Sequence, residues 1–89
     1  IDLNLPLMVD FETKGLYGDI TLAQFMQEGW EEALLVEHPD RLMLQSILID
    51  AWVVCYNTAY DMGTLDIVPA KMDDLFYAAR TAFPHHDGF

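Results

Sequence analysis

The stretch from Leu42 to Met62 is the most apolar part of the chain, and its pattern constrains the fold more than any other feature. Pro39 suits the first position of a helix and Gly63 suits a helix stop, so one helix is expected over residues 39–62. Such a helix would extend about 36 Å, at 1.5 Å per residue. Because aspartates and an asparagine interrupt its apolar residues, the segment is not expected to span a membrane.

Two further helical patterns flank this segment. Thr21 and Gln24 have the spacing of a capping box and precede an apolar stripe, which predicts a helix over residues 22–36. Pro69 suits the first turn of a third helix, and an apolar stripe then continues to Phe83. The three patterns together indicate helices packed against one another.

The first twenty residues have a different pattern. Aliphatic residues alternate with polar ones around Pro6, which predicts an extended entry arm over residues 1–20, because proline removes one hydrogen-bond donor. Residues 21–83 then form the helical core and residues 84–89 a tail. The sequence therefore predicts a single all-α domain, a small bundle of three principal helices with an extended N-terminal arm.

The composition of the chain limits the kinds of partner that it is expected to bind. The chain has 89 residues, of which 53% are hydrophobic, and a chain of this length buries only about 60–65% of its unfolded surface. The surplus apolar surface predicts a homodimer or a partner interface. Four lysines and arginines oppose fifteen aspartates and glutamates, for a net charge of −11, which disfavours direct binding to nucleic acid or anionic membranes. The acidity either attracts a basic protein or only keeps the domain soluble.

The predicted long helix carries a second apolar series beside its core face. Its members recur at steps of four and three residues, the spacing of a coiled-coil seam. The series comprises Leu42, Ser46, Ile49, Val53, Tyr56 and Tyr60. We predict that Leu42, Ile49, Val53, Tyr56 and Tyr60 form a partner or dimer interface, with the tyrosines contributing both apolar area and a hydroxyl. The alternative is that both faces of the helix are core.

A row of acidic residues offers a second contact surface. Glu28, Glu31 and Glu32 fall on the polar side of the first predicted helix. Such a row could imitate phosphates and occupy a nucleic-acid-binding groove, although most charge rows are simply solvated. Binding through this face should weaken sharply with salt, whereas binding through the apolar series should survive.

No residue pattern points to catalysis. Cys55 is the only cysteine, so the chain cannot form an internal disulfide, and a reducing cytoplasm suits it. It has no neighbouring lysine, arginine or histidine in the sequence to activate the thiol. The histidines lack a metal-ligand framework, and the adjacent Asp73 and Asp74 point apart on a helix. We therefore expect no enzyme activity, no cofactor and no metal.

In its acidity, size and long apolar segment from Leu42 to Tyr60, the chain resembles small bacterial anti-activators. That resemblance implies a cytoplasmic inhibitor that binds a transcription regulator and keeps it from dimerising or reaching DNA. The sequence thus predicts a small acidic protein-binding inhibitor or adaptor. Two alternatives remain, a nucleic-acid mimic using the acidic face and a non-catalytic subunit of an enzyme complex.

Overall fold

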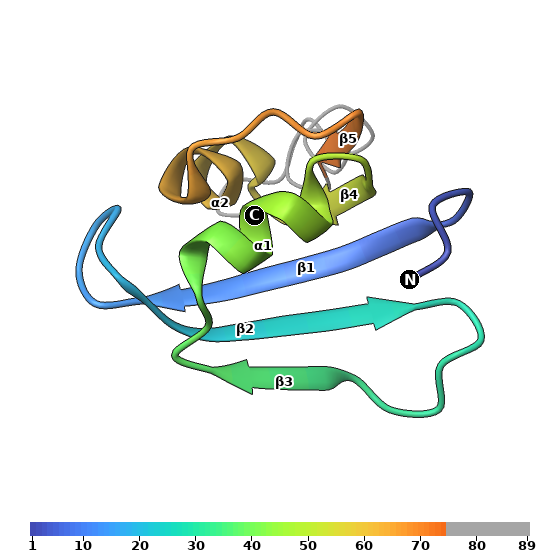
Figure 1. The fold of residues 1–89 in the computed structure, drawn as a ribbon, viewed down its shortest axis with the longest axis horizontal. Helices are drawn as coiled ribbons and strands as arrows, with labels where there is room; N and C mark the ends of the chain where they lie inside the picture. Colours follow the sequence, from blue (N-terminus) through green and yellow to red (C-terminus); the bar gives the residue numbers. More distant parts are fainter. Residues whose placement is uncertain (75–89) are drawn as a thin grey trace, which may run out of the picture.

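In the computed structural model, which describes residues 1–74, a five-stranded mixed sheet carries two short helices on one face (Figure 1). The sheet order is β3-β2-β1-β4-β5. The elements in chain order are β1 (Pro6–Thr13), β2 (Ile20–Gln27), β3 (Leu34–Glu37), α1 (Arg41–Leu48), β4 (Trp52–Cys55), α2 (Thr58–Leu65) and β5 (Lys71–Asp74). The predicted all-α bundle is therefore wrong.

Strand β1 lies at the centre of the sheet, where strand direction changes. It pairs antiparallel with β2, and β2 pairs antiparallel with β3. On its other side β1 pairs parallel with β4, placing Leu7 opposite Val53, and β4 pairs parallel with β5. The carboxyl ends of β1, β4 and β5 consequently meet at one edge of the sheet.

Alternation of apolar residues explains why these segments are strands. Every second side chain of β1 is buried, and the same holds for the last part of β2. These side chains form one core with residues from both helices, which places α1 and α2 on the same face. The buried core comprises Leu7, Val9, Phe11, Ala23, Phe25, Leu44, Leu48, Ala51, Val53, Cys55, Met62 and Leu65.

The predicted helix over residues 39–62 breaks into three elements. Helix α1 ends at Leu48, and the chain then turns into β4. Val53 is completely buried within that strand, between β1 and β5. The β-branched pair Val53 and Val54 suits a strand, and a short apolar run fits a buried strand as well as a helix. The residues with coiled-coil spacing therefore belong to two helices and a strand, and they do not lie along one helix.

The other helical predictions fail for related reasons. Residues Ile20–Gln27 form strand β2, so the proposed capping box at Thr21 caps nothing. The predicted arm contains β1, which is the central strand and not an extended appendage. Pro69 leads into strand β5 instead of a helix. The remainder of the third predicted helix and the predicted tail lie outside the described residues.

Both helices begin with a side chain that caps them. Asp40 accepts a hydrogen bond from the backbone N–H of Met43 at 3.1 Å, and Asn57 accepts one from that of Tyr60 at 3.4 Å. Helix α2 ends at Leu65, and the capping residue Asp66 adopts a left-handed conformation. Within the described part of the chain, neither helix is long and apolar enough to cross a membrane.

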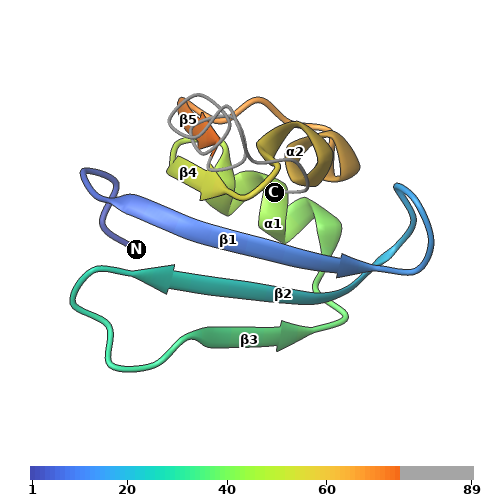
Figure 2. The same cartoon turned by 180° about the vertical axis from the view of Figure 1, so that it is seen from behind.

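The two faces of the sheet differ in what covers them. Both helices pack over one face, and Figure 2 shows the other face with no described helix in front of it. Met8, on that open face, is 50% exposed, and its neighbour Met26 on β2 is partly buried. The open face therefore presents apolar side chains of the central strands to solvent, next to the edge where the parallel strands end.

Candidate functional site

Two carboxylates stand at the carboxyl end of the central strand. Asp10 and Glu12 are exposed and alternate with the buried Val9 and Phe11, so both lie on the open face. The pairing of β1 with β2 becomes irregular directly after Glu12. The parallel pairing of β1 with β4 covers only Pro6 to Met8, so this end of β1 extends beyond the end of β4.

A third carboxylate reaches this edge from α2. The helix starts just beyond the carboxyl end of β4, and Asp61 lies in its first turn. The side chain of Asp61 is only 7% exposed, which is unusual for an aspartate. Its neighbour in the core is Cys55, the last residue of β4, whose thiol hydrogen-bonds the carboxylate. Strand and helix thus bring Asp61 toward β1.

The pKa of Asp61 reflects both its burial and the charges around it. Burial raises the pKa of Asp61 to about 6; the hydrogen bond from Cys55 opposes that rise, while the negative charges of Asp10 and Asp74 add to it. None of the interactions that shift this pKa comes from a lysine or arginine of residues 1–74. Burial, together with Asp61, also raises the pKa of the Cys55 thiol, so the thiol stays protonated.

The end of β5 is tied to the same helix start. The carboxylate of Asp74 accepts a hydrogen bond from the backbone N–H of Thr58 at 3.1 Å, and the Thr58 hydroxyl donates to the carbonyl of Asp73 at 2.8 Å. These bonds fix the N-terminus of α2 against the sheet. As a result, the position of Asp61 is set by two parallel strands and is not free to drift.

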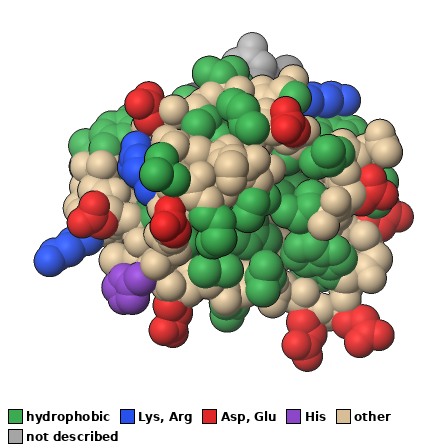
Figure 3. All heavy atoms as spheres, in the orientation of Figure 1, with side chains coloured by type: hydrophobic (Ala, Val, Ile, Leu, Met, Phe, Trp, Pro, Cys, Tyr) green, Lys and Arg blue, Asp and Glu red, His purple; other side chains and the backbone are tan. Residues whose placement is uncertain are grey.

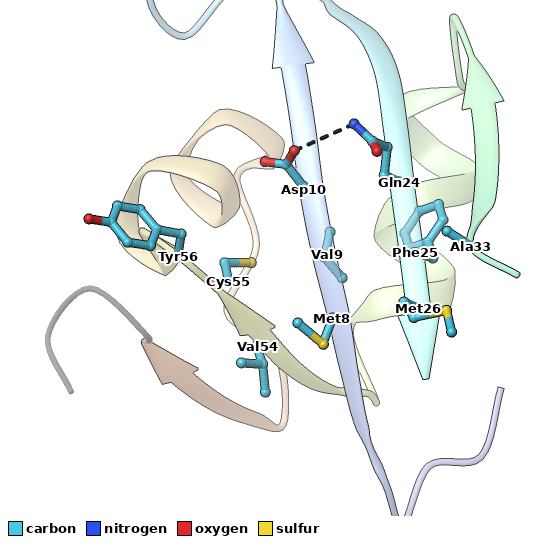
Figure 4. Close-up of a pocket in the computed structure, with 10 residues that line it drawn as sticks. All are labelled: Met8, Val9, Asp10, Gln24, Phe25, Met26, Ala33, Val54, Cys55 and Tyr56. Carbon is cyan, nitrogen blue, oxygen red and sulfur yellow. Dashed lines mark hydrogen bonds between the residues drawn. The ribbon is translucent and has the colours of Figure 1, made fainter. Parts of the chain in front are cut away.

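A shallow groove of about 360 Å³ runs across the open face beside these carboxylates (Figure 4). Asp10 forms part of its wall, and its Oδ2 atom lies 3.5 Å from Nε2 of Gln24. The rest of the lining is mostly apolar and comes from β1, β2, β4 and the segments next to β3 and β4: Met8, Val9, Phe25, Met26, Ala33, Val54, Cys55 and Tyr56. The groove thus places an acidic group at the side of an apolar trough.

The oxygen donors of Asp10, Glu12 and Asp61 suit Mg²⁺ or Mn²⁺, which prefer carboxylates, whereas the protonated thiol of Cys55 does not suit zinc. Among residues 1–74, no three His, Cys, Asp or Glu side chains already form a metal-binding cluster. Mg²⁺ does not require one, because proteins commonly hold it through one or two carboxylates plus oxygens of the substrate and water. The described carboxylates are thus of the chemical type that a hard divalent cation prefers, without forming a cluster around one position.

The predicted interface residues do not share one surface. Leu42 in α1 and Ile49 at its end are exposed, whereas Val53 is core within β4. Tyr56 follows β4 and lines the groove, and Tyr60 lies in α2. Their assignment to one helix face is wrong, and contact with a partner stays a prediction for those that are exposed.

The predicted acidic contact face lies in a loop and not on a helix. Glu28, Glu31 and Glu32 are exposed in the connection between β2 and β3, not on a helix. Glu28 borders a second, largely apolar hollow at the end of β2, together with Met8, Met26 and Trp30. Their negative charge is solvated, and binding through this loop stays a prediction.

Sequence reasoning missed Asp10, Glu12 and Asp61. A signal for the first two was present, because Val9-Asp10-Phe11-Glu12 alternates apolar and acidic residues in the strand period. Asp61 had no such signal, since its burial depends on the fold of distant segments.

Comparison with protein-family models, curated proteins and solved structures finds no match for this chain. Its function is therefore argued from the geometry of the carboxylates and the groove.

Proposed function

We propose that the domain is a divalent-cation-dependent phosphodiester hydrolase that acts on nucleic acid. One observation carries the proposal: Asp10 lines the apolar groove on the open face, and the buried Asp61 lies in the first turn of α2, just beyond the carboxyl end of β4. Glu12 stands two residues beyond Asp10 on the same face. No lysine or arginine of residues 1–74 is among the charges that perturb Asp61.

Such an arrangement is costly for a domain that only has to fold. A buried carboxylate beside others lowers stability when it is ionised, and proteins keep groups of this kind mainly at functional sites. A bound divalent cation would reverse the cost, because it supplies the missing positive charge. The raised pKa of Asp61 is therefore expected to fall when the cation binds.

The chemistry follows from the donor set. A divalent cation can lower the pKa of bound water and neutralise charge on a phosphoryl group, as in nucleases and phosphatases. In this chain, Asp10 would provide an exposed oxygen at the wall of the groove, Glu12 another further along the same strand face, and Asp61 one from the start of α2. The hydrogen bonds from Thr58 to β5 hold that last ligand in place. This proposal departs from the sequence-based expectation that the chain is not an enzyme, and the cleavage assay below decides between the two.

The groove favours a nucleic acid over a simple phosphate ester. Met8, Met26 and Tyr56 offer apolar and aromatic surface beside Asp10, and bases of single strands stack on such surfaces. The net charge of −11 repels a polyanion, so the backbone phosphate has to be recruited through the cation. Substrate binding should therefore be lost when a chelator removes the metal.

Mn²⁺ provides a direct probe, because it broadens NMR signals of nearby nuclei. Titrated into the labelled chain, it should first broaden the backbone amides of Asp10, Glu12 and Asp61. Asp10→Asn should weaken that broadening, whereas Glu31→Gln, a matched change in an exposed loop, should not. Broadening spread over the acidic surface without preference for these amides would refute the site.

Hydrolysis is tested separately with an end-labelled single-stranded oligonucleotide in the presence of Mg²⁺ or Mn²⁺. Shortened products should appear with the wild-type chain and with Glu31→Gln, and should be absent with Asp10→Asn or with a chelator. Site-specific Mn²⁺ binding without cleavage would leave a metal site but reject the hydrolase.

Protein binding is a second candidate, favoured by one specific feature. Leu42, Met43, Ile47 and Ile49 of α1 and its end are all exposed, and Figure 3 shows hydrophobic side chains gathered across the middle of the helix face, with acidic ones at its rim. This surface could serve the predicted inhibitor, adaptor or homodimer, including an anti-activator. Sedimentation equilibrium at micromolar concentration tests the dimer, and Ile47→Asp should abolish it if α1 is the interface.

A further inference from the structure

Strand β3 forms one edge of the sheet (Figure 1). Among residues 1–74, it pairs with β2 on one side and has no strand on the other. Proteins usually protect such an edge with lysine, proline, a bulge or a covering segment, because its free backbone groups attract another strand. The sequence of β3, Leu34-Leu35-Val36-Glu37, has neither lysine nor proline, and its pairing with β2 runs without a register shift. The strand therefore lacks the usual protection in its own sequence.

The register of β3 determines which of its backbone groups point outward. The N–H of His38 donates to the carbonyl oxygen of Thr21, the residue opposite it, at 2.9 Å. In an antiparallel pair, positions that exchange hydrogen bonds alternate with positions that do not. The even-numbered residues of β3 therefore bond β2, whereas the N–H and C=O groups of Leu35 and Glu37 point away from it. These are the groups that a further strand would bond.

The side chains of β3 are apolar and exposed on both faces of the sheet. Leu34 lies opposite the buried Phe25 and so shares the face that carries the helices, yet it is 52% exposed. Leu35 lies opposite Gln24 on the open face and is 58% exposed. A helix docked on one face would cover only one of these leucines. A strand added beside β3 would flank both, since its own side chains alternate between the two faces.

The occupant that best fits this edge is a second copy of β3. When two copies run antiparallel about a twofold axis at Leu35, the two Leu35 residues bond each other and Leu34 lies beside Val36 of the other copy. Apolar side chains then meet apolar ones on both faces of the sheet. Glu37, the acidic residue of β3, lies opposite Ala33 in the same register. No two carboxylates of the paired strands therefore face each other, which like charges would make unfavourable.

We propose that the chain forms a weak homodimer in which two β3 strands pair antiparallel and continue the sheet from one copy into the other. This inference does not depend on the proposed function. Two four-residue strands bury less area than a stable interface needs, so the dissociation constant is expected to lie above the micromolar range. Because each copy carries a net charge of −11, salt should strengthen the dimer by screening the repulsion between them.

Hydrogen exchange measured by NMR tests the pairing directly. The amides of Leu35 and Glu37 should exchange several-fold more slowly in millimolar than in micromolar samples, because only the dimer gives them acceptors. The amide of Val36, which bonds β2, should be protected to the same extent in both. Sedimentation equilibrium over the same concentrations should show the mass rising toward that of two chains. Unprotected amides of Leu35 and Glu37 in millimolar samples would overturn the proposal.

The matched variants are Leu35→Lys and Leu42→Lys. Each replaces an exposed leucine outside the core with the same cation. Leu35→Lys sets two lysines opposite each other across the proposed pair, so it should abolish the dimer and the protection of the Glu37 amide. Leu42→Lys, on α1, should leave both unchanged. The reverse result would overturn the β3 pairing and assign the dimer to α1. Should Leu35→Lys fail to fold, the hydrogen-exchange comparison in the wild type decides alone.

Discussion

Replacing Asp61 with asparagine should stabilise the protein above pH 6 while destroying its metal site. The pKa of Asp61 rises from 3.8 to about 6 because the carboxyl is buried and lies near other negative charges. One pKa unit corresponds to 1.36 kcal/mol, so ionising Asp61 in the folded state costs up to about 3 kcal/mol. Asparagine is neutral, and its amide oxygen can still accept the hydrogen bond from the Cys55 thiol.

The sign of the pH dependence follows from proton binding. Below pH 4 the carboxyl is protonated in both states and costs nothing. Between pH 4 and 6 the unfolded chain ionises first, so the folded state binds more protons and wild-type stability falls as the pH rises. Above pH 6 the difference levels off. The advantage of Asp61→Asn should therefore grow from near zero at pH 4 to a maximum of about 3 kcal/mol at pH 7.5.

Urea unfolding of both proteins at a series of pH values measures this advantage, and the difference between them cancels the titration of all other groups. Glu31→Gln is the control and should stay within about 0.5 kcal/mol of the wild type, because that side chain is exposed. Adding Mn²⁺ should stabilise the wild type and not Asp61→Asn. An advantage that is independent of pH, or a variant less stable than the wild type at pH 7.5, would refute the reasoning.

Three further predictions concern the fold. Leu65→Ala should cost about 2–5 kcal/mol in urea unfolding, because Leu65 is fully buried, whereas Leu42→Ala in exposed α1 should cost little. Gly63→Ala should raise thermal stability by about 0.5–1 kcal/mol, since its Cβ would meet nothing closer than 3.7 Å, while Gly18→Ala should lower it through the clash with the backbone. The Cys55 thiol should react with a disulfide reagent only after denaturant is added, because burial raises its pKa; fast reaction of native protein would contradict this.

The failure of the predicted helices has a common physical cause. In residues 39–62, apolar side chains recur closely enough to satisfy a helical period, and Val53 and Val54 satisfy a buried strand equally well. Only pairing with β1 and β5 decides between them, and those segments are distant in sequence. The strand alternation of β1 was visible, but Pro6 suggested an edge; the proline in fact occupies the first residue of the central strand, where it is tolerated.

The candidate site shows the same limit. Asp10 and Glu12 could have been placed on one strand face from their spacing. Asp61 could not be joined to them, because that requires knowing that β4 lies parallel to β1 and that α2 begins at its carboxyl end. Acidity was recognised as a property of the whole chain, whereas the fold concentrates part of it at one edge of the sheet.

The parallel pairing of β1 with β4 also sets the order in which the molecule can assemble. Strands β1, β2 and β3 follow one another and pair antiparallel, so they can form from local contacts. Joining β4 to β1 closes a loop that contains β2, β3 and α1, and that closure carries the larger entropic barrier. Until it happens, Asp61 is remote from Asp10 and the mutual repulsion of the carboxylates is not felt. The domain can therefore complete most of its sheet before it has to bring like charges together, and a cation present at that late step would act on the folding rate as well as on the finished site.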